Sequence, residues 1–217
     1  MTVYKIPRHL SCLIFDIDGT LYTSSAYVFE QVDAQIRHFA HIHGMTEEEA
    51  RNKITSWRRE WSRAHGGKKI SLGNTFTAFG VPILTSIQWR NTILEPEKFL
   101  HVDKKMQETI SLLAKKYKLV CVTNNPVTAA KRTLRAIGLE ELLPNVVGLD
   151  TCMKSKPNKD VLRYAAKMMG VPFKECLSVG DRYDIDLALP LELGMGAILV
   201  GGAEEVYALP DLLSCNV

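Results

Sequence analysis

The sequence lacks the features that would place it outside ordinary globular proteins. Its longest apolar run, residues 194–203, is well short of the roughly 18 residues that a membrane-spanning helix needs. There is no low-complexity segment, and 46% hydrophobic and 24% charged residues exclude an intrinsically disordered chain. We therefore expect no membrane partner. A chain of 217 residues is long enough for one or two domains with a buried core.

Cysteine is scarce and scattered. The five cysteines are odd in number and none forms a CxxC pair, which argues against a disulfide framework or a zinc site. The pattern favours a reducing compartment, so we expect a cytoplasmic protein. The cysteines are Cys12, Cys121, Cys152, Cys176 and Cys215, and the first two fall in expected strands as small core residues.

The charge balance is nearly even, with 27 basic and 24 acidic residues and a net charge of +3. Because the two signs are interspersed, no nucleic-acid partner is expected. The exception is residues 51–69, which hold seven Lys or Arg against a single Glu. Four residues there follow amphipathic helical spacing and predict a packed face, the alternative being a basic rim for an anionic substrate. They are Ile54, Trp57, Trp61 and His65.

Short apolar runs alternate with helical patterns over most of the chain. The runs are rich in β-branched residues and show no polar alternation, as in parallel strands covered on both faces. One helical pattern begins around Asn124-Asn125-Pro126 and ends at Gly138, and another covers residues 158–169 before Gly170. This order predicts an α/β fold with a doubly wound parallel sheet. The expected strands are residues 13–15, 119–122, 146–149, 177–179 and 197–200.

The strand signal vanishes between residues 23 and 99. Helices are expected at residues 27–43, 72–79 and 86–94, and Thr46 with Glu49 forms a capping box that opens one more. We therefore predict an all-helical cap domain, residues 23–99, inserted into an α/β core made of residues 1–22 and 100–217.

Three of the expected strands end in chemically reactive side chains. Asp16, the pair Thr123-Asn124, and Asp181 each follow an apolar run directly. The carboxyl ends of parallel strands share one edge of a sheet, so these residues are expected to converge there. Asp18 follows Asp16 by two residues, and Gly19 allows a turn so that both carboxylates border one pocket.

The motifs resemble those of the haloacid dehalogenase-like (HAD) superfamily of hydrolases. The resemblance rests on the string DIDGTLY from Asp16, on Thr123, on Lys156 before Pro157, and on Gly180-Asp181 followed by Asp186. It implies a Rossmann-like core with a helical C1-type cap. The length of the insert and the residues LY and LEP are weakly similar to pyrimidine 5'-nucleotidase-like members.

The resemblance and the chemistry of the side chains imply a role for each position. Asp16 is expected to attack phosphorus as the nucleophile, and Asp18 to act as general acid and then base. Lys156 and Mg²⁺ supply the positive charge that an anionic substrate requires. Thr123 and Asn124 are expected to bind phosphate at a helix N-terminus, although Asn124 or Asn125 could instead cap that helix. Metal ligands are expected from Asp16, the backbone carbonyl of Asp18, Asp181 and Asp186.

Some assignments have rivals in the sequence. Lys154 competes with Lys156, which follows Ser155 where many family members have glycine, and Asp184 competes with Asp186. Pro190 predicts that the next helix either starts late or is kinked. The histidines at positions 38, 41 and 43 lie at a helix end without carboxylate or cysteine neighbours, which favours a structural interpretation over a metal site.

Taken together, the sequence predicts a Mg²⁺-dependent phosphatase of a small phosphorylated metabolite that works through an aspartyl-phosphate intermediate. The cap is expected to close over the site and to select the leaving group, with Tyr22, Tyr27, Arg58, Arg59 and Arg63 as candidate substrate contacts. Alternatives are a nucleoside monophosphate 5'-nucleotidase, a phosphomutase, and a non-catalytic protein that binds nucleic acid or an acidic partner. No pattern in the sequence predicts a particular oligomeric state.

Overall fold

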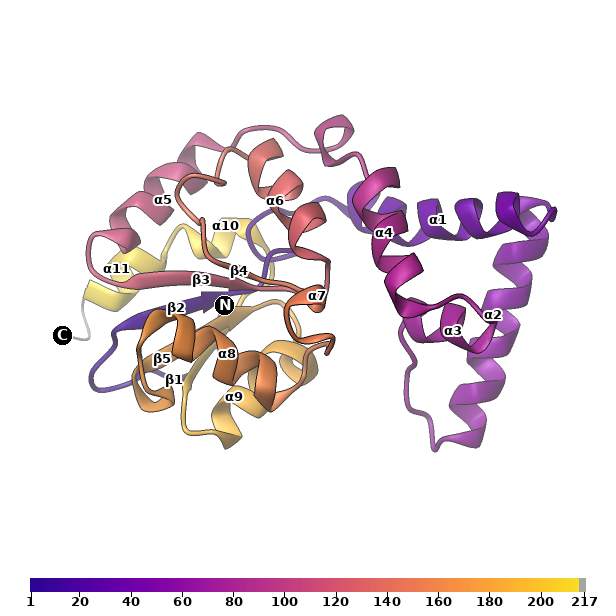
Figure 1. Cartoon of the computed structure of the whole chain (residues 1–217). Coiled ribbons are helices and arrows are strands. Elements are labelled where there is room, and N and C mark those ends of the chain that lie inside the picture. Colours follow the sequence, from indigo (N-terminus) through magenta and orange to yellow (C-terminus); the bar gives the residue numbers. More distant parts are fainter. Residues whose placement is uncertain (215–217) are drawn as a thin grey trace. The chain divides into compact units, whose positions relative to one another are not determined.

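The computed structural model describes residues 1–214, so Cys215 lies outside the described residues. The chain divides into two compact units (Figure 1). The core unit contains Met1–Ser25 and the chain from Glu95 onward, and the helical unit is Ala26–Leu94, where the sequence placed an insert at residues 23–99. Within residues 1–214, no helix is both long and apolar enough to cross a membrane.

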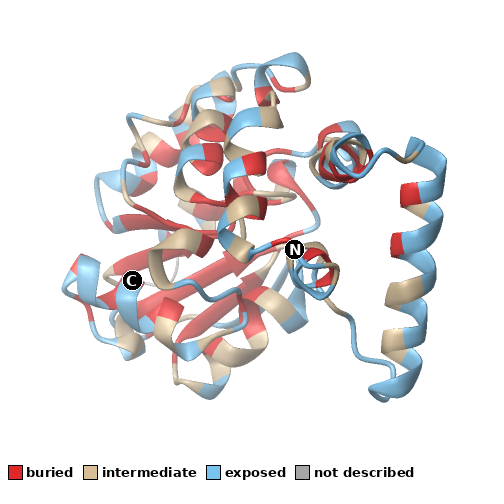
Figure 2. Ribbon diagram, turned by 45° about the vertical axis from the view of Figure 1, so that its right-hand side comes forward, coloured by how far each residue is buried: buried red, intermediate tan, exposed pale blue. Residues whose placement is uncertain are grey.

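The core unit is built on one six-stranded sheet with the order β1-β6-β5-β2-β3-β4. The central strands are buried along their whole length, as Figure 2 shows, which explains why their sequences are apolar without alternation. All pairings are parallel except that of β1 with β6. The strands are β1 (Thr2–Lys5), β2 (Cys12–Phe15), β3 (Lys118–Val122), β4 (Val146–Val147), β5 (Cys176–Gly180) and β6 (Gly196–Leu199).

Helices cover both faces of this sheet, with α5 and α6 on one side and α8 and α9 on the other (Figure 1). The sheet topology and the helix layers confirm the predicted α/β doubly wound fold. The helices of the core unit are α5 (Lys104–Ala114), α6 (Val127–Ala136), α7 (Leu149–Cys152), α8 (Lys159–Met169), α9 (Ala188–Glu192), α10 (Ala203–Val206) and α11 (Leu209–Ser214).

The register of the parallel strands brings three chain segments to one edge. Phe15, the last residue of β2, pairs with Cys121 on one side and with Val179 on the other. The backbone N–H of Asp16 continues this ladder by donating to the carbonyl of Val179 at 2.9 Å. The residues that follow β2, β3 and β5 therefore lie side by side.

The helical unit has its own apolar core, which a stacked Phe39–Phe76 pair and the edge of Trp89 help to form. Its helices are joined by polar contacts as well: Asp33, almost fully buried, accepts hydrogen bonds from Arg37 at 2.5 Å and from Arg51 at 2.7 Å. The helices are α1 (Ser25–Ile42), α2 (Glu47–Ala64), α3 (Leu72–Ala78) and α4 (Ile83–Ile93).

The basic segment belongs to α2 and the turn that follows it. Ile54 is buried, Trp57 packs edge-on against Phe79, and Trp61 stacks on His65 with ring centroids 3.9 Å apart. This arrangement agrees with the interpretation of the stripe as a packed face. Two histidines near the end of α1 also pack on aromatic rings, His38 on Trp89 and His43 on Phe39.

Several expected element boundaries are wrong. The strand expected at residues 146–149 ends at Val147, because Gly148 is the N-cap of α7 and Leu149 already begins that helix. Helix α4 begins at Ile83, directly after Pro82, and not at residue 86. The antiparallel edge strand β1 was not predicted at all, because its side chains are exposed and carry no apolar pattern.

The sequence predicts that the helix containing Pro190 either starts late or is kinked, and α9 starts only at Ala188. A π-helical turn, Tyr183–Leu187, precedes α9, and Pro190 is the third residue of that helix. A first-turn N–H has no partner within its own helix, so proline is tolerated there.

The capping box predicted from Thr46 and Glu49 is present at the start of α2. The hydroxyl of Thr46 accepts from the N–H of Glu49 at 3.2 Å, and the Glu49 carboxylate accepts from the N–H of Thr46 at 2.7 Å. Thr46→Ala should lower the free energy of unfolding by about 1 kcal/mol. Thr55→Ala, at an exposed interior position of the same helix, should change it by a few tenths at most. Chemical denaturation of both variants checks this, and equal effects would contradict the cap's contribution.

Candidate active site

Asp16 and the turn after it form the centre of the site. Asp16 follows β2 directly and is 3% exposed. Gly19 adopts a φ of +83°, and a Cβ there would lie 2.7 Å from a carboxylate oxygen of Asp181. Only glycine meets both demands, because other residues rarely adopt this φ and their Cβ would displace Asp181. The turn is therefore what allows the chain after Asp16 to pass close to Asp181.

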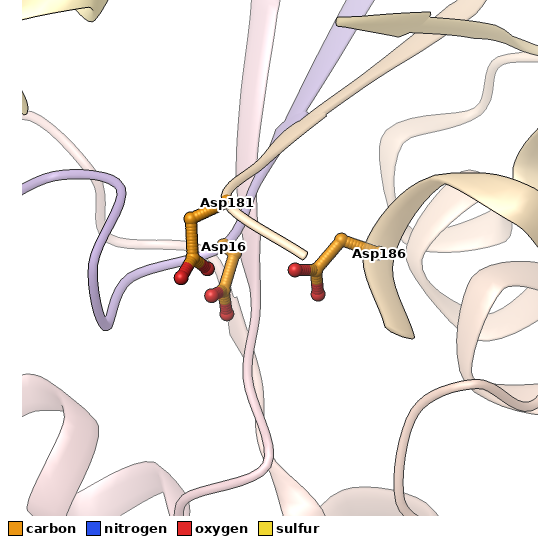
Figure 3. A group of neighbouring side chains, drawn as sticks. All are labelled: Asp16, Asp181 and Asp186. Atoms are coloured by element: carbon orange, nitrogen blue, oxygen red, sulfur yellow. The ribbon is translucent and has the colours of Figure 1, made fainter. Parts of the chain in front are cut away.

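Three carboxylates gather at this edge of the sheet. Asp16, Asp181 and Asp186 each offer an oxygen within 4.8 Å of the others, and Figure 3 shows Asp181 beside Asp16 while Asp186 points toward them from the far side. Burial and the nearby charge of Asp16 raise the pKa of Asp181 to about 6. Burial likewise raises the pKa of Asp186. The cluster therefore holds more negative charge than its surroundings neutralise.

Lys156 is the cation placed inside this cluster. Its Nζ lies 2.5 Å from Asp16 Oδ1 and 2.7 Å from Asp186 Oδ1, and its side chain is 6% exposed. Burial alone lowers the pKa of a lysine, but the charges of Asp16 and Asp186 outweigh it and raise the pKa of Lys156. Its sequence rival, Lys154, instead pairs with Asp160 on the surface, at 2.5 Å.

The cluster fits a bound divalent cation. Asp16 Oδ2 and Asp181 Oδ1 are buried carboxylate oxygens without a hydrogen-bond partner among the described residues. Buried acceptors of this kind are costly unless something positive lies against them. Hard cations such as Mg²⁺ prefer carboxylate oxygens, so the donor set suits such an ion. The side chain of Asp18 is not part of this set, which leaves its backbone carbonyl as the expected ligand.

Asp18 is held by donors from two segments. The hydroxyl of Tyr22 donates to Asp18 Oδ1 at 2.5 Å, and the side-chain amide of Asn125 donates to Oδ2 at 3.0 Å. The hydroxyl of Thr123 also faces Oδ2, at 3.4 Å. Tyr22 had been expected to face substrate from the cap region, whereas the structure buries it against Asp18.

The side chain of Asn124 is bonded to the backbone of Lys156. Its side chain accepts from the Lys156 backbone N–H at 2.6 Å and donates to the Lys156 carbonyl at 3.3 Å. The helix-capping alternative is wrong, because Pro126 is the cap residue of α6 and makes no side-chain cap bond. The first N–H of α6, that of Val127, donates to Asp150 Oδ1 at 2.9 Å.

Asp186 rather than Asp184 reaches the cluster. Asp184 is exposed, whereas Asp186 is 3% exposed and accepts from the Arg182 backbone N–H at 3.1 Å. The hydroxyl of Ser178 donates to the Asp186 carbonyl at 2.9 Å and anchors it to β5. A Cβ at Gly180 would lie 2.4 Å from that of Asp186, so the glycine makes room for this carboxylate.

Sequence reasoning missed three residues that shape the site: Tyr22 as a donor to Asp18, Asn125, and Asp150. Asn125 donates to Asp18, and Asp150 accepts from the first N–H of α6. Their positions in the sequence do not distinguish these roles from those of solvent-exposed side chains. Arg58, a candidate substrate contact, instead donates to the Ile70 carbonyl within the helical unit, at 2.8 Å.

Comparison with known proteins defines the family. The haloacid dehalogenase-like hydrolase family matches residues 10–191, which is more than half of the chain, so this protein belongs to that family. Among solved structures, an HAD phosphatase from Thermococcus onnurineus superposes with a TM-score of 0.64 at 20% identity, covering 94% of this chain and 98% of that one. The HAD-hydrolase YfnB from Bacillus subtilis, bound to magnesium, gives 0.60 at 16% identity, covering 94% and 99%.

Several curated relatives are phosphatases. The 5-amino-6-(5-phospho-D-ribitylamino)uracil phosphatase YigB of Escherichia coli is 24% identical over 91% of this chain and 86% of the relative. A phosphoglycolate phosphatase of Colwellia psychrerythraea is 26% identical over 78% and 75%. A glyceraldehyde 3-phosphate phosphatase of Methanocaldococcus jannaschii is 28% identical over 84% and 81%. The expectation of an HAD-like enzyme that hydrolyses phosphoric monoesters is confirmed at this level.

The raised pKa of Asp181 predicts how stability responds to pH in the absence of metal. The folded protein retains a proton up to about pH 6 that the unfolded chain releases near the ordinary value of 3.8. The folded state therefore binds more protons in this window, and its stability falls as pH rises through it. Asp181→Asn should remove this part of the fall and stabilise the metal-free protein at neutral pH, by up to about 3 kcal/mol.

Thermal unfolding in EDTA across this pH range measures the effect. Asp184→Asn is the matched control, because that side chain is exposed in the same segment and lies outside the cluster. If Asp181→Asn shows the same pH dependence as the unsubstituted protein, the buried like-charge cluster is not the cause.

Proposed function

We propose that this protein is a Mg²⁺-dependent phosphatase that hydrolyses a small phosphorylated metabolite through a phosphoryl-Asp16 intermediate. The observation that carries the proposal is the buried carboxylate of Asp16, with Lys156 Nζ 2.5 Å away and two further carboxylates within 4.8 Å. A nucleophile, a fixed cation and an acidic metal-ligand set are the parts that phosphoryl transfer to a carboxylate needs.

Each residue has a distinct task in this proposal. Asp16 attacks phosphorus and forms an acyl phosphate as the bond to the leaving oxygen breaks. Lys156 lowers the repulsion between this carboxylate and the phosphate and stabilises the charge that spreads over the phosphoryl oxygens. Asp18 donates a proton to the leaving oxygen and then, as a carboxylate, removes a proton from the water that attacks the acyl phosphate. Thr123, 2% exposed at the end of β3, offers its hydroxyl to a phosphoryl oxygen.

The proposed cofactor is Mg²⁺. Asp16, Asp181 and Asp186, with the backbone carbonyl of Asp18, would hold the ion. When bound, it would supply positive charge that neutralises the carboxylates and the incoming phosphate. Lys156 and Arg182, whose Nε lies 3.8 Å from Asp181 Oδ1, supply two positive charges against three carboxylates and an incoming phosphate.

We assign selectivity for the leaving group to the helical insert, residues 23–99. The residues that carry out the phosphoryl transfer belong to the core. The three phosphatases compared above act on phosphorylated compounds of low molecular weight, which supports a substrate of the same kind here. The free thiols of Cys12, Cys121, Cys152 and Cys176 support a reducing, cytoplasmic location.

Activity with p-nitrophenyl phosphate tests the proposal. Turnover should require Mg²⁺ and disappear with EDTA, since the carboxylate cluster then repels the substrate. Asp16→Asn should lower kcat by on the order of a thousandfold or more, because the amide is not a nucleophile. Asp184→Asn should retain activity close to that of the unsubstituted protein. Turnover that survives Asp16→Asn would refute the covalent mechanism.

A panel of small phosphate esters tests the substrate class. Sugar phosphates, nucleoside monophosphates and phosphoglycolate, assayed by phosphate release, should include at least one with kcat/KM well above that for p-nitrophenyl phosphate, because a natural leaving group adds binding energy in the transition state. Preference confined to nucleoside monophosphates would favour the 5'-nucleotidase alternative. Transfer of phosphate between positions of one sugar, without release, would favour the phosphomutase.

A further inference from the structure

Two consecutive asparagines after β3 contact two different chemical groups of the site. The side chain of Asn124 binds the backbone of Lys156, and that of Asn125 binds the carboxylate of Asp18. Lys156 and Asp18 lie far apart in the sequence, in segments that belong to neither a long helix nor a sheet strand. One short segment therefore touches both the cation and the proton-transfer residue.

Asn124 is bonded to Lys156 through both ends of its amide. The oxygen accepts from the Lys156 N–H at 2.6 Å and the NH₂ group donates to the Lys156 carbonyl at 3.3 Å. This pair of bonds fixes the backbone position and direction of a loop residue whose ammonium must reach Asp16. An aspartate lacks the donor and a threonine lacks the length, so the amide is specifically suited to this contact.

The backbone of Asn125 is held in place by hydrogen bonds to two other segments. Its N–H donates to the hydroxyl of Thr123 at 3.1 Å, and its carbonyl accepts from the N–H of Leu149 at 3.0 Å. Gly148 passes so close to that carbonyl that no Cβ fits between them. With its backbone fixed on both sides, Asn125 presents its NH₂ group to Asp18 Oδ2 from a set position.

We propose that Asn124 and Asn125 are paired positioning residues: Asn124 places the ammonium of Lys156, and Asn125 orients the carboxylate of Asp18. The assignment rests on the proposed function. Each asparagine is assigned to position one residue of the site, and neither is assigned to bind phosphate. Displacements on the order of 1 Å in a catalytic group cost about a hundredfold in rate. Asn124→Ala and Asn125→Ala should therefore each lower kcat/KM by about 10- to 100-fold.

Double-mutant cycles test which partner each asparagine acts through. If Asn124 acts only through Lys156, Asn124→Ala has little further effect in a Lys156→Ala background but keeps its full effect in an Asp18→Ala background. Asn125→Ala should show the reverse pattern. The measurement is kcat/KM for p-nitrophenyl phosphate in the four double variants and the parent proteins. Full additivity in all four cycles would overturn the pairing and indicate direct contact with substrate or a merely structural role.

The leaving group provides a second readout that a structural role would not change. p-Nitrophenolate departs without a proton, whereas the alkoxide from glycerol 2-phosphate needs one from the general acid. The loss in kcat/KM from Asn125→Ala should therefore be about tenfold larger with glycerol 2-phosphate. The loss from Asn124→Ala should be equal with both esters, because Lys156 acts on the phosphoryl group common to them. Equal losses for both variants would contradict the assignment of Asn125 to Asp18.

Asn145→Ala is the matched control. That residue precedes β4, and its side chain also donates to a backbone carbonyl, that of Leu119, at 3.4 Å. It should leave kcat/KM unchanged, and a loss equal to that of the site variants would overturn the proposal. If an alanine variant fails to fold by thermal unfolding, Asn124→Ser or Asn125→Ser takes its place in the same cycles. An unsubstituted protein without phosphatase activity would overturn the proposed function and this assignment together, whereas additive cycles in an active enzyme would overturn only the assignment.

Discussion

Like-charge repulsion at one edge of the sheet is the constraint on which the site depends. Asp16, Asp181 and Asp186 lie within reach of one another in a largely buried space, and a single ammonium, that of Lys156, lies among them. Such an arrangement adds little to stability, because removing charges from water costs about as much as their pairing returns. A further cation and an anionic substrate would complete the balance, in line with the metal-assisted phosphoryl transfer proposed above.

The fold tolerates this repulsion because the charged residues are attached to its most rigid part. β2, β3 and β5 are buried and hydrogen-bonded on both sides, so Asp16, Thr123 and Asp181 start from fixed backbone positions. The glycines at positions 19 and 180 remove the Cβ atoms that would keep Asp181 and Asp186 away from the centre.

The sequence allowed the sheet and the strand-end residues to be predicted, but not the contacts between them. Asp16, Thr123 and Asp181 follow apolar runs, so their convergence comes from topology alone. Choosing Lys156 over Lys154, and Asp186 over Asp184, required family spacing, because both members of each pair have the same local pattern. The bond of Asn124 to Lys156 could not be predicted, since its partner lies 32 residues away in a loop. The exposed strand β1 has no apolar signal to reveal it.

All the residues with a proposed chemical task belong to the core unit, and this separation has a consequence for how the protein is specialised. The helical unit has its own apolar core and a buried carboxylate, Asp33, that bonds α1 to α2 through Arg51. Because it does not rely on the site for its internal packing, its surface side chains can change without disturbing Asp16 or Lys156. Relatives that hydrolyse different phosphate esters fit such a division, since the chemistry at phosphorus is common to them and only the leaving group differs. Under the proposed assignment of leaving-group selectivity to the insert, substitutions in residues 26–94 should alter the choice of substrate more than the rate with a small, activated ester. Substitutions in the core should alter that rate more than the choice of substrate.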